Sequence, residues 1–125
     1  MMTEGVQKNS DRELPVPKKW RPMIADIVGA IVRNDFSFED LNVRVEPPSE
    51  KLQDYIRESI GDYGCTLIAL RADVWKHAVY ICFEDHWQVI VDLCSEEEGV
   101  SDLALHLKVH DDIVPKFEIS SVHVP

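Results

Sequence analysis

The sequence lacks any hydrophobic run of the roughly 18–20 residues that a membrane helix needs. Residues 1–19 contain no apolar segment of the kind found in secretory signal peptides, so we expect a cytoplasmic protein. Basic residues are also scarce, since 13 Lys and Arg oppose 23 Asp and Glu and leave a net charge of −10. Nucleic-acid binding relies on a basic surface that displaces counterions, and the composition therefore argues against a nucleic-acid partner.

The short motifs of common catalytic sites are absent too. The chain has no Gly-rich phosphate loop, no G-x-S-x-G and no HExxH. Cys65, Cys82 and Cys94 form no CxxC pair, and each lies in or beside an apolar run. We interpret them as reduced thiols that pack as small hydrophobic side chains. A reactive role would suit Cys94 best, but the acidic residues that follow it would raise its thiol pKa and weaken the nucleophile.

Histidines and carboxylates are the remaining candidate metal ligands. His106 and His110 would lie on one side of a strand but about 13 Å apart, at about 3.3 Å per residue, and only a neighbouring-strand residue such as His123 could assist them. The carboxylates at 96–98 and 102 do not follow the spacing of an EF-hand loop. We therefore predict no metal site, no cofactor and no catalytic residue. The five histidines are His77, His86, His106, His110 and His123.

Two helices are predicted in the first half of the chain. An apolar stripe at helical spacing predicts a helix from Lys18 to about Arg33, with Pro22 in its first turn. Ser49 is suited to cap the start of a second helix, and Gly61 to end it. Residues 1–17 carry no periodicity and are predicted to form a flexible tail. The stripe comprises Trp20, Met23, Ile24, Ile27, Val28 and Ile31.

After Gly64 the apolar pattern changes to a period of two, which is typical of strands. Five segments have this pattern: CTLIALR, HAVYICFE, WQVIVDL, residues 103–109 and KFEISSVHV. Tight turns are expected at 84–86 and 111–115, and residues 43–45 form a further short candidate strand. Together these elements predict one α+β domain over residues 18–125. In it, two N-terminal helices pack on an antiparallel meander of about five strands.

The acidic charge is concentrated near the C-terminus. Residues 84–118 hold ten acidic and two basic side chains, a net charge of −8. Such a surface attracts a basic partner and can raise association rates by about 10–1,000-fold. An exposed Trp87 beside it would serve as an aromatic anchor, and a buried one would belong to the core. The plainer interpretation is that acidic loops keep a small domain soluble.

Several segments resemble those of a family of small uncharacterised bacterial domains with a VDL–EEG–SDL–HVP signature. They are WRPMIADIVGAIV, YGCTL, WQVIVDLCSEEEGVSDLALHLKV and FEISSVHVP, and the resemblance covers about residues 18–125. In size, acidity and single-domain build, the chain also resembles the immunity proteins of contact-dependent growth inhibition and related polymorphic toxin systems. The resemblance supplies no catalytic residues, and it implies a protein that neutralises a toxin.

We therefore predict an immunity protein, not an enzyme, that binds and neutralises a cognate toxin C-terminal domain. A basic nuclease is the expected kind of toxin, and no nucleic acid or membrane is expected as a partner. An interface of the standard size of about 1,600 Å² with a few aromatic anchors is enough for very tight binding. The predicted partner-binding residues are Glu84, Asp85, Trp87, Asp92, Glu96, Glu97, Glu98 and Asp102.

The sequence leaves two other interpretations of residues 92–106 open. In the first, Asp92, Glu98, Asp102 and His106 converge in a small-molecule-binding or hydrolytic pocket, where burial drives the carboxyl pKa values apart. In the second, the segment is structural: Gly99 supplies an unusual backbone angle, and Ser101 or Asp102 caps the turn. An acidic loop that points outward favours the inhibitor, and one folded into a pocket favours the enzyme.

Overall fold

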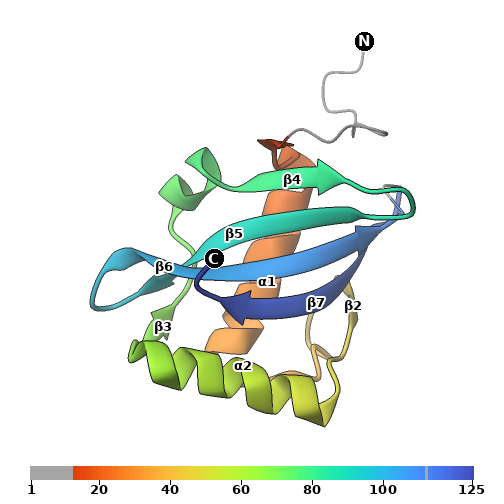
Figure 1. Cartoon of the computed structure of the whole chain (residues 1–125). Helices are drawn as coiled ribbons and strands as arrows, with labels where there is room; N and C mark the ends of the chain where they lie inside the picture. The colour runs from red at the N-terminus through yellow and green to blue at the C-terminus, as the bar shows by residue number, and fades with distance from the viewer. Residues whose placement is uncertain (1–12, 112) are drawn as a thin grey trace.

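A seven-stranded sheet and two α-helices make up the computed structural model, which describes residues 13–111 and 113–125 (Figure 1). The strand order is β1-β4-β5-β6-β7-β2, and β3 pairs separately with β5. The strands are β1 (Leu14–Pro15), β2 (Arg44–Glu46), β3 (Leu67–Ile68), β4 (Val79–Cys82), β5 (Trp87–Ser95), β6 (Gly99–His110) and β7 (Lys116–His123). The helices are α1 (Arg21–Val32) and α2 (Glu50–Tyr63), with 3-10 turns η1 (Lys18–Trp20) and η2 (Ala72–Lys76).

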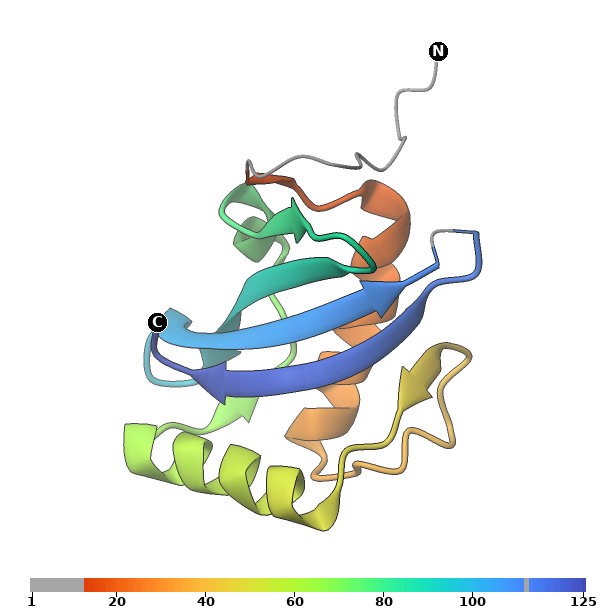
Figure 2. The same ribbon diagram turned by 45° about the vertical axis from the view of Figure 1, so that its right-hand side comes forward.

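Strands β4 to β7 form an antiparallel meander, and β2 adds a parallel strand beside β7. Helix α1 crosses behind the meander in Figure 1, and α2 runs along the β7 side of the sheet. Figure 2, turned by 45°, shows the same arrangement with α1 on the far side of the strands. One face of the meander is therefore covered by a helix, and the other is turned toward the viewer of Figure 1.

Helix α1 forms where the apolar stripe predicts it. Pro22 occupies the first turn, where its missing N–H costs no helical hydrogen bond. The stripe is buried except for the partly buried Met23, and the fully buried Trp20 ring packs edge-on against Tyr80 with 5.6 Å between ring centroids. The helix ends at Val32, after which Asn34 adopts a left-handed backbone angle. The predicted helix is confirmed.

Helix α2 begins as predicted and ends later. The Ser49 hydroxyl accepts a hydrogen bond from the Leu52 N–H at 3.2 Å, which confirms the predicted cap. The prediction that Gly61 ends the helix is wrong, because the chain stays helical to Tyr63 and Gly64 takes the left-handed position with φ 78°. Gly61 and Gly64 both follow the apolar residues of the helix, and the spacing of those residues does not show which glycine ends it.

The strand predictions identify the meander but not the whole sheet. The α+β class with two helices is confirmed. The predicted number of about five strands is too low, because β1 and β2 add to the five predicted segments, and the two helices do not both precede the sheet. Strands β1 and β2 precede α2, and β2 is parallel to its partner. A two-residue strand such as β1 has no measurable period. The pairing of β2 with β7 joins segments about 70 residues apart, which local pattern cannot reveal.

The packed part of the chain also begins earlier than predicted. Of the expected flexible tail at 1–17, residues 1–12 lie outside the described residues. Leu14 and Pro15 pair with Tyr80 and Val79 of β4, and Val16 is buried in the core. The three cysteines are free thiols, as predicted, although only Cys94 is fully buried. No helix in the described ranges is long and apolar enough to cross a membrane.

The helix end at Gly64 leads to a paired stability prediction. Gly61→Ala should raise the free energy of unfolding by about 0.5–1 kcal/mol, because alanine favours a helix and an added Cβ meets nothing within 4 Å. Gly64→Ala should lower it by about 1–2 kcal/mol, because a left-handed angle is costly for any residue with a Cβ. Urea unfolding of both variants measures the difference, and the reverse order would place the end of α2 at Gly61.

Candidate functional site

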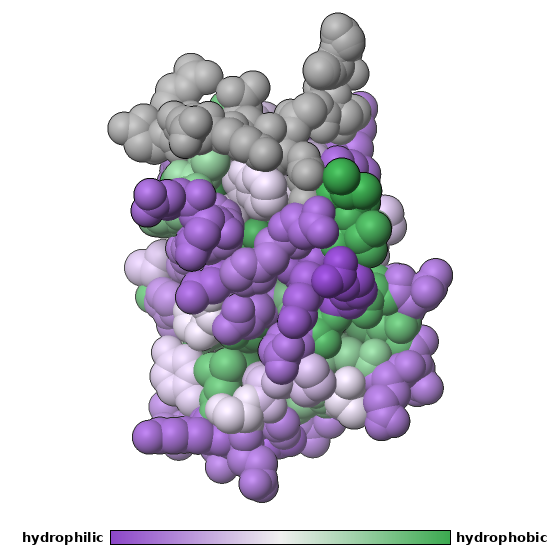
Figure 3. All heavy atoms as spheres, turned by 90° about the vertical axis from the view of Figure 1, so that its right-hand side faces the viewer, coloured by the Kyte–Doolittle hydropathy of each residue, from purple (hydrophilic) through white to green (hydrophobic). Residues whose placement is uncertain are grey.

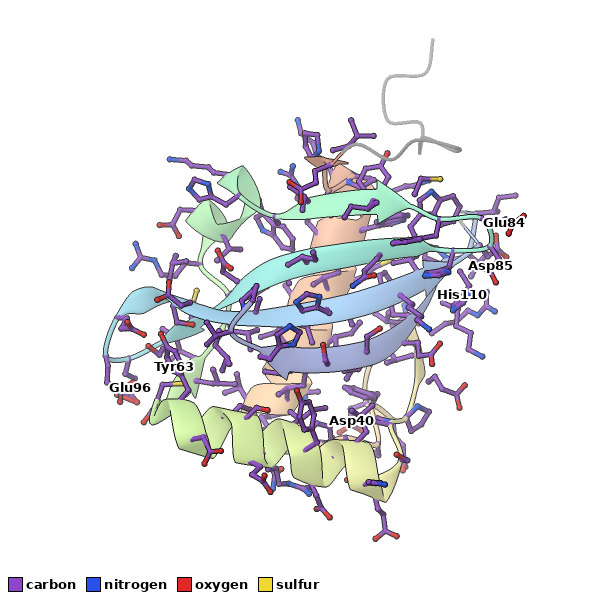
Figure 4. The ribbon with its side chains drawn as sticks, viewed as in Figure 1. Asp40, Tyr63, Glu84, Asp85, Glu96 and His110 are labelled. Carbon is purple, nitrogen blue, oxygen red and sulfur yellow. The ribbon has the colours of Figure 1, made fainter. Side chains whose placement is uncertain are left out.

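The structure divides the predicted partner-binding residues between the two ends of the sheet. Glu96, Glu97 and Glu98 form the turn between β5 and β6, which we call the acidic turn. Glu84 and Asp85 lie in the β4–β5 turn at the other end, as Figure 4 shows. Asp102 lies on β6 near the acidic turn, and Asp92 lies on β5 between the two ends. The eight residues therefore do not form one continuous surface.

Trp87 is a core residue and not an exposed anchor. Only 7% of its surface is exposed, and its ring centroid lies 5.9 Å from that of Trp20. The exposed aromatic at this turn is Phe83, which is 45% exposed and stacks on His86 with 5.0 Å between ring centroids. Sequence reasoning missed Phe83, although its position beside Glu84 was a usable signal.

Local backbone chemistry shapes the acidic turn. The buried Ser95 hydroxyl accepts a hydrogen bond from the Glu98 N–H at 3.1 Å. Gly99 has φ 76°, and a Cβ there would lie 2.7 Å from Nη1 of Arg71. The expected unusual angle at Gly99 is thus present, but the cap comes from Ser95. The Ser101 hydroxyl instead donates to the Leu93 carbonyl at 2.8 Å.

Tyr63, the last residue of α2, ties the acidic turn to the helix. Its hydroxyl donates to Oε1 of Glu98 at 2.5 Å and accepts from the Asp102 N–H at 3.1 Å. We call these two contacts the Tyr63 bridge. Oε1 of Glu97 accepts from the Thr66 N–H at 2.9 Å, and the Thr66 carbonyl accepts from the Glu96 N–H at the same distance. Two contacts thus hold this part of the sheet against the last residue of α2, and two more hold the turn against Thr66 in the segment that follows the helix.

The four carboxylates in and beside the acidic turn consequently have different roles. Those of Glu97 and Glu98 form hydrogen bonds within the domain. Those of Glu96 and Asp102 form no hydrogen bond or ion pair with any residue the structure describes, and both residues are exposed. The turn and the neighbouring part of β6 therefore present Glu96 and Asp102 outward from a fixed backbone.

The electrostatics of the turn follow from these contacts. The hydrogen bond from the Thr66 N–H lowers the pKa of Glu97, because it stabilises the charged carboxylate. The hydrogen bond to Glu98 raises the pKa of Tyr63, because an ionised phenol would lose the bond and meet a like charge. Burial, and then the charges of Glu97 and Glu98, raise the pKa of the Cys65 thiol. The same charge therefore makes Cys65 a poor nucleophile.

A groove of about 360 Å³ lies beside the Tyr63 bridge. Helix α2 forms one wall, and the ends of β6 and β7 form the other. Its polar lining includes a carboxylate, a phenol, a hydroxyl and an imidazole. The lining residues are Ser59, Asp62, Tyr63, Leu103, His123 and Val124.

The alternative pocket requires Asp92, Glu98, Asp102 and His106 to converge, but the structure gives these residues different partners. Burial, reinforced by the charge of Asp102, raises the pKa of Asp92, and His77 opposes this shift. Glu98 is turned toward Tyr63 instead. Asp92 pairs with Ala104 of β6, which places Asp102 and His106 diagonally on either side of it, and Glu98 lies apart from this position.

His106 has its own surroundings on the sheet face opposite α1. It is 9% exposed, its Nδ1 lies 3.2 Å from Nε2 of Gln88, and its ring stacks on His123 with 4.4 Å between centroids. Burial, with a smaller contribution from His123, lowers the pKa of His106. Among the described residues, no group of three His, Cys, Asp or Glu side chains is arranged to hold a metal ion.

The opposite end of the sheet faces the viewer of Figure 3. Hydrophilic residues cover most of this face, and hydrophobic ones gather in a band toward the right. Nδ1 of His86 lies 2.7 Å from Oδ1 of Asp85, and this contact lowers the pKa of Asp85. Ile113 and Val114 of the β6–β7 turn are exposed. This end combines carboxylates with apolar side chains. Among the described residues, no tyrosine there forms a bridge between a turn and a helix like that of Tyr63.

A comparison with protein families assigns the chain to a family. The model of a domain of unknown function (DUF7668) matches residues 28–125. The chain belongs to this family. The matched region begins within α1 and includes the acidic turn, the Tyr63 bridge and the groove. No curated protein and no solved structure matches the chain.

The Tyr63 bridge gives a pH-dependent prediction. Tyr63 should ionise above the ordinary tyrosine value of 10.0, and Glu98→Gln should bring its pKa down, because the neutral amide no longer repels the phenolate. A phenol with a raised pKa in the folded state stabilises the fold below about pH 10. This contribution is lost as the pH rises through the folded-state value. Ultraviolet titration measures the ionisation.

Tyr63→Phe and Tyr55→Phe identify the residue in this titration. The transition that Glu98→Gln shifts should disappear in Tyr63→Phe and persist in Tyr55→Phe, because the Tyr63 hydroxyl is the one that donates to Glu98. Loss of the transition in Tyr55→Phe, or no change in Glu98→Gln, would show that the bridge does not form in solution.

Proposed function

We propose that this domain is a cytoplasmic immunity protein that binds and neutralises a basic toxin domain through its acidic turn. The Tyr63 bridge is the observation that supports the proposal best. It holds the backbone of the turn against α2 and leaves the exposed carboxylates of Glu96 and Asp102 without a partner among the described residues. An acidic loop that points outward favours an inhibitor over an enzyme.

A fixed acidic loop suits this function for two physical reasons. Binding costs free energy when a loop has to become ordered, and the Tyr63 bridge orders this loop before the toxin arrives. Unpaired carboxylates also attract a basic surface over long range and speed the encounter, which an inhibitor of a lethal protein needs. The toxin surface that binds the acidic turn would be the one that approaches its own anionic substrate.

Growth rescue tests the proposal in cells. The polypeptide encoded immediately upstream is expected to end in the toxin domain, and its C-terminal domain should kill cells when expressed alone. Co-expression of this protein should restore growth. If the neighbour is harmless, or kills in the presence of this protein, the proposal is contradicted.

Charge reversal then locates the binding surface. Glu96→Lys should slow association with the toxin domain by about tenfold and reduce its salt dependence, because an exposed carboxylate near the interface acts mainly on the encounter rate. Glu84→Lys is the matched control, with the same charge change on an exposed turn at the other end of the sheet. Stopped-flow or biosensor kinetics at two salt concentrations measure the effect. Equal slowing by both variants would point to net charge and not to the acidic turn.

A further inference from the structure

We propose that the groove between α2 and the end of β7 binds an arginine side chain. The inference rests on the proposed function and names the group of the basic partner that this surface would receive. The groove has a volume of about 360 Å³ and lies beside the Tyr63 bridge, on the side of the sheet nearest α2. Tyr63 and Glu96 both lie at this end in Figure 4.

The charge of the groove favours a cation. The carboxylate of Asp62 lines it, and none of the six lining residues is Lys or Arg. Asp62 has no ion-pair partner among the residues described, whereas Asp54 on the same helix pairs with Arg57 at 3.3 Å. Glu98 and Asp102 lie next to the groove through the Tyr63 bridge and add to the negative potential. A cationic side chain in the groove would therefore meet uncompensated negative charge.

The shape of the lining favours arginine over lysine. Tyr63 and His123 both contribute flat rings, on which a planar guanidinium can stack and a compact ammonium cannot. Val124, which is 51% exposed, provides apolar surface for the methylene groups of the side chain, over the buried Leu103. The Ser59 hydroxyl is a further hydrogen-bond acceptor. The groove thus offers one partner for each part of an arginine side chain.

Neighbouring contacts hold the rings that line the groove. The hydroxyl of Tyr63 is engaged by Glu98 and the Asp102 N–H, which leaves the faces of its ring for other contacts. His123 stacks on the buried His106 and lies with its Nδ1 3.0 Å from the Ser121 hydroxyl. A ligand therefore meets side chains that are already positioned, which lowers the entropic cost of binding.

Capped tripeptides test the proposal on the full-length protein. An acetylated, amidated Gly-Arg-Gly peptide should shift the amide signals of Asp62, Tyr63 and His123 in a ¹H–¹⁵N NMR titration. The matched peptide with citrulline, which has the same shape and no charge, should bind at least about tenfold more weakly. Equal binding of the two peptides, or arginine-dependent shifts confined to residues 83–86, would overturn the proposal.

A pair of isosteric variants makes the test specific for the groove. Asp62→Asn should abolish the preference for arginine over citrulline. Asp54→Asn removes the same charge two turns earlier on α2, outside the groove, and should leave the preference unchanged. An unchanged preference in Asp62→Asn would overturn the proposal, and the NMR spectrum of each free variant confirms that it is folded.

The two proposals can fail separately. Failure of growth rescue, with the arginine peptide still bound in the groove, would contradict the immunity function alone. Successful rescue, with no arginine preference in the peptide titration, would contradict the groove site alone.

Discussion

The packing of α1 under one face of the β4–β7 meander is the constraint on which the rest of the structure depends. The helix buries its apolar stripe, and the strand residues that face it, such as Val89, Leu105 and Phe117, are fully buried. With one face committed to the core, polar and charged side chains are left to the opposite face, the turns and the outer surface of α2. The acidic surface is therefore a consequence of how the core is built, and its position is set by where the turns fall.

Tyr63 connects this architecture to the candidate site. Helix α2 lies along the β7 side of the sheet, and its last residue reaches the turn between β5 and β6. Because the helix continues past Gly61, the Tyr63 hydroxyl can bind both Glu98 and the backbone of Asp102. The same residue forms part of the groove beside the turn. The ordered acidic turn, its negative charge and the groove thus lie together at one end of the molecule, whereas the opposite end carries exposed apolar side chains.

Local features of the fold could be predicted from the sequence, and long-range ones could not. The stripe of α1, the cap at Ser49, the alternation in β5 to β7 and the special angle at Gly99 each depend on neighbouring residues, and all are present. The Tyr63 bridge joins residues 35 positions apart, and no local pattern marks it. The burial of Trp87 depends on its contact with Trp20, so its place beside an acidic turn was misleading. The prediction grouped acidic residues by sequence, but β5 carries Glu84 and Glu96 to opposite ends of the sheet.

In the proposed function, the acidic turn and the end of α2 form the surface that binds a basic protein partner. Hydrogen exchange of this protein, alone and in complex with the toxin domain that we propose as its partner, tests this directly. Exchange in the complex should be slower for the amides of residues 59–66 and 96–102 and unchanged at 83–86. Slower exchange at 83–86 and 113–115, with residues 96–102 unchanged, would contradict it and place the binding surface at the opposite end of the sheet.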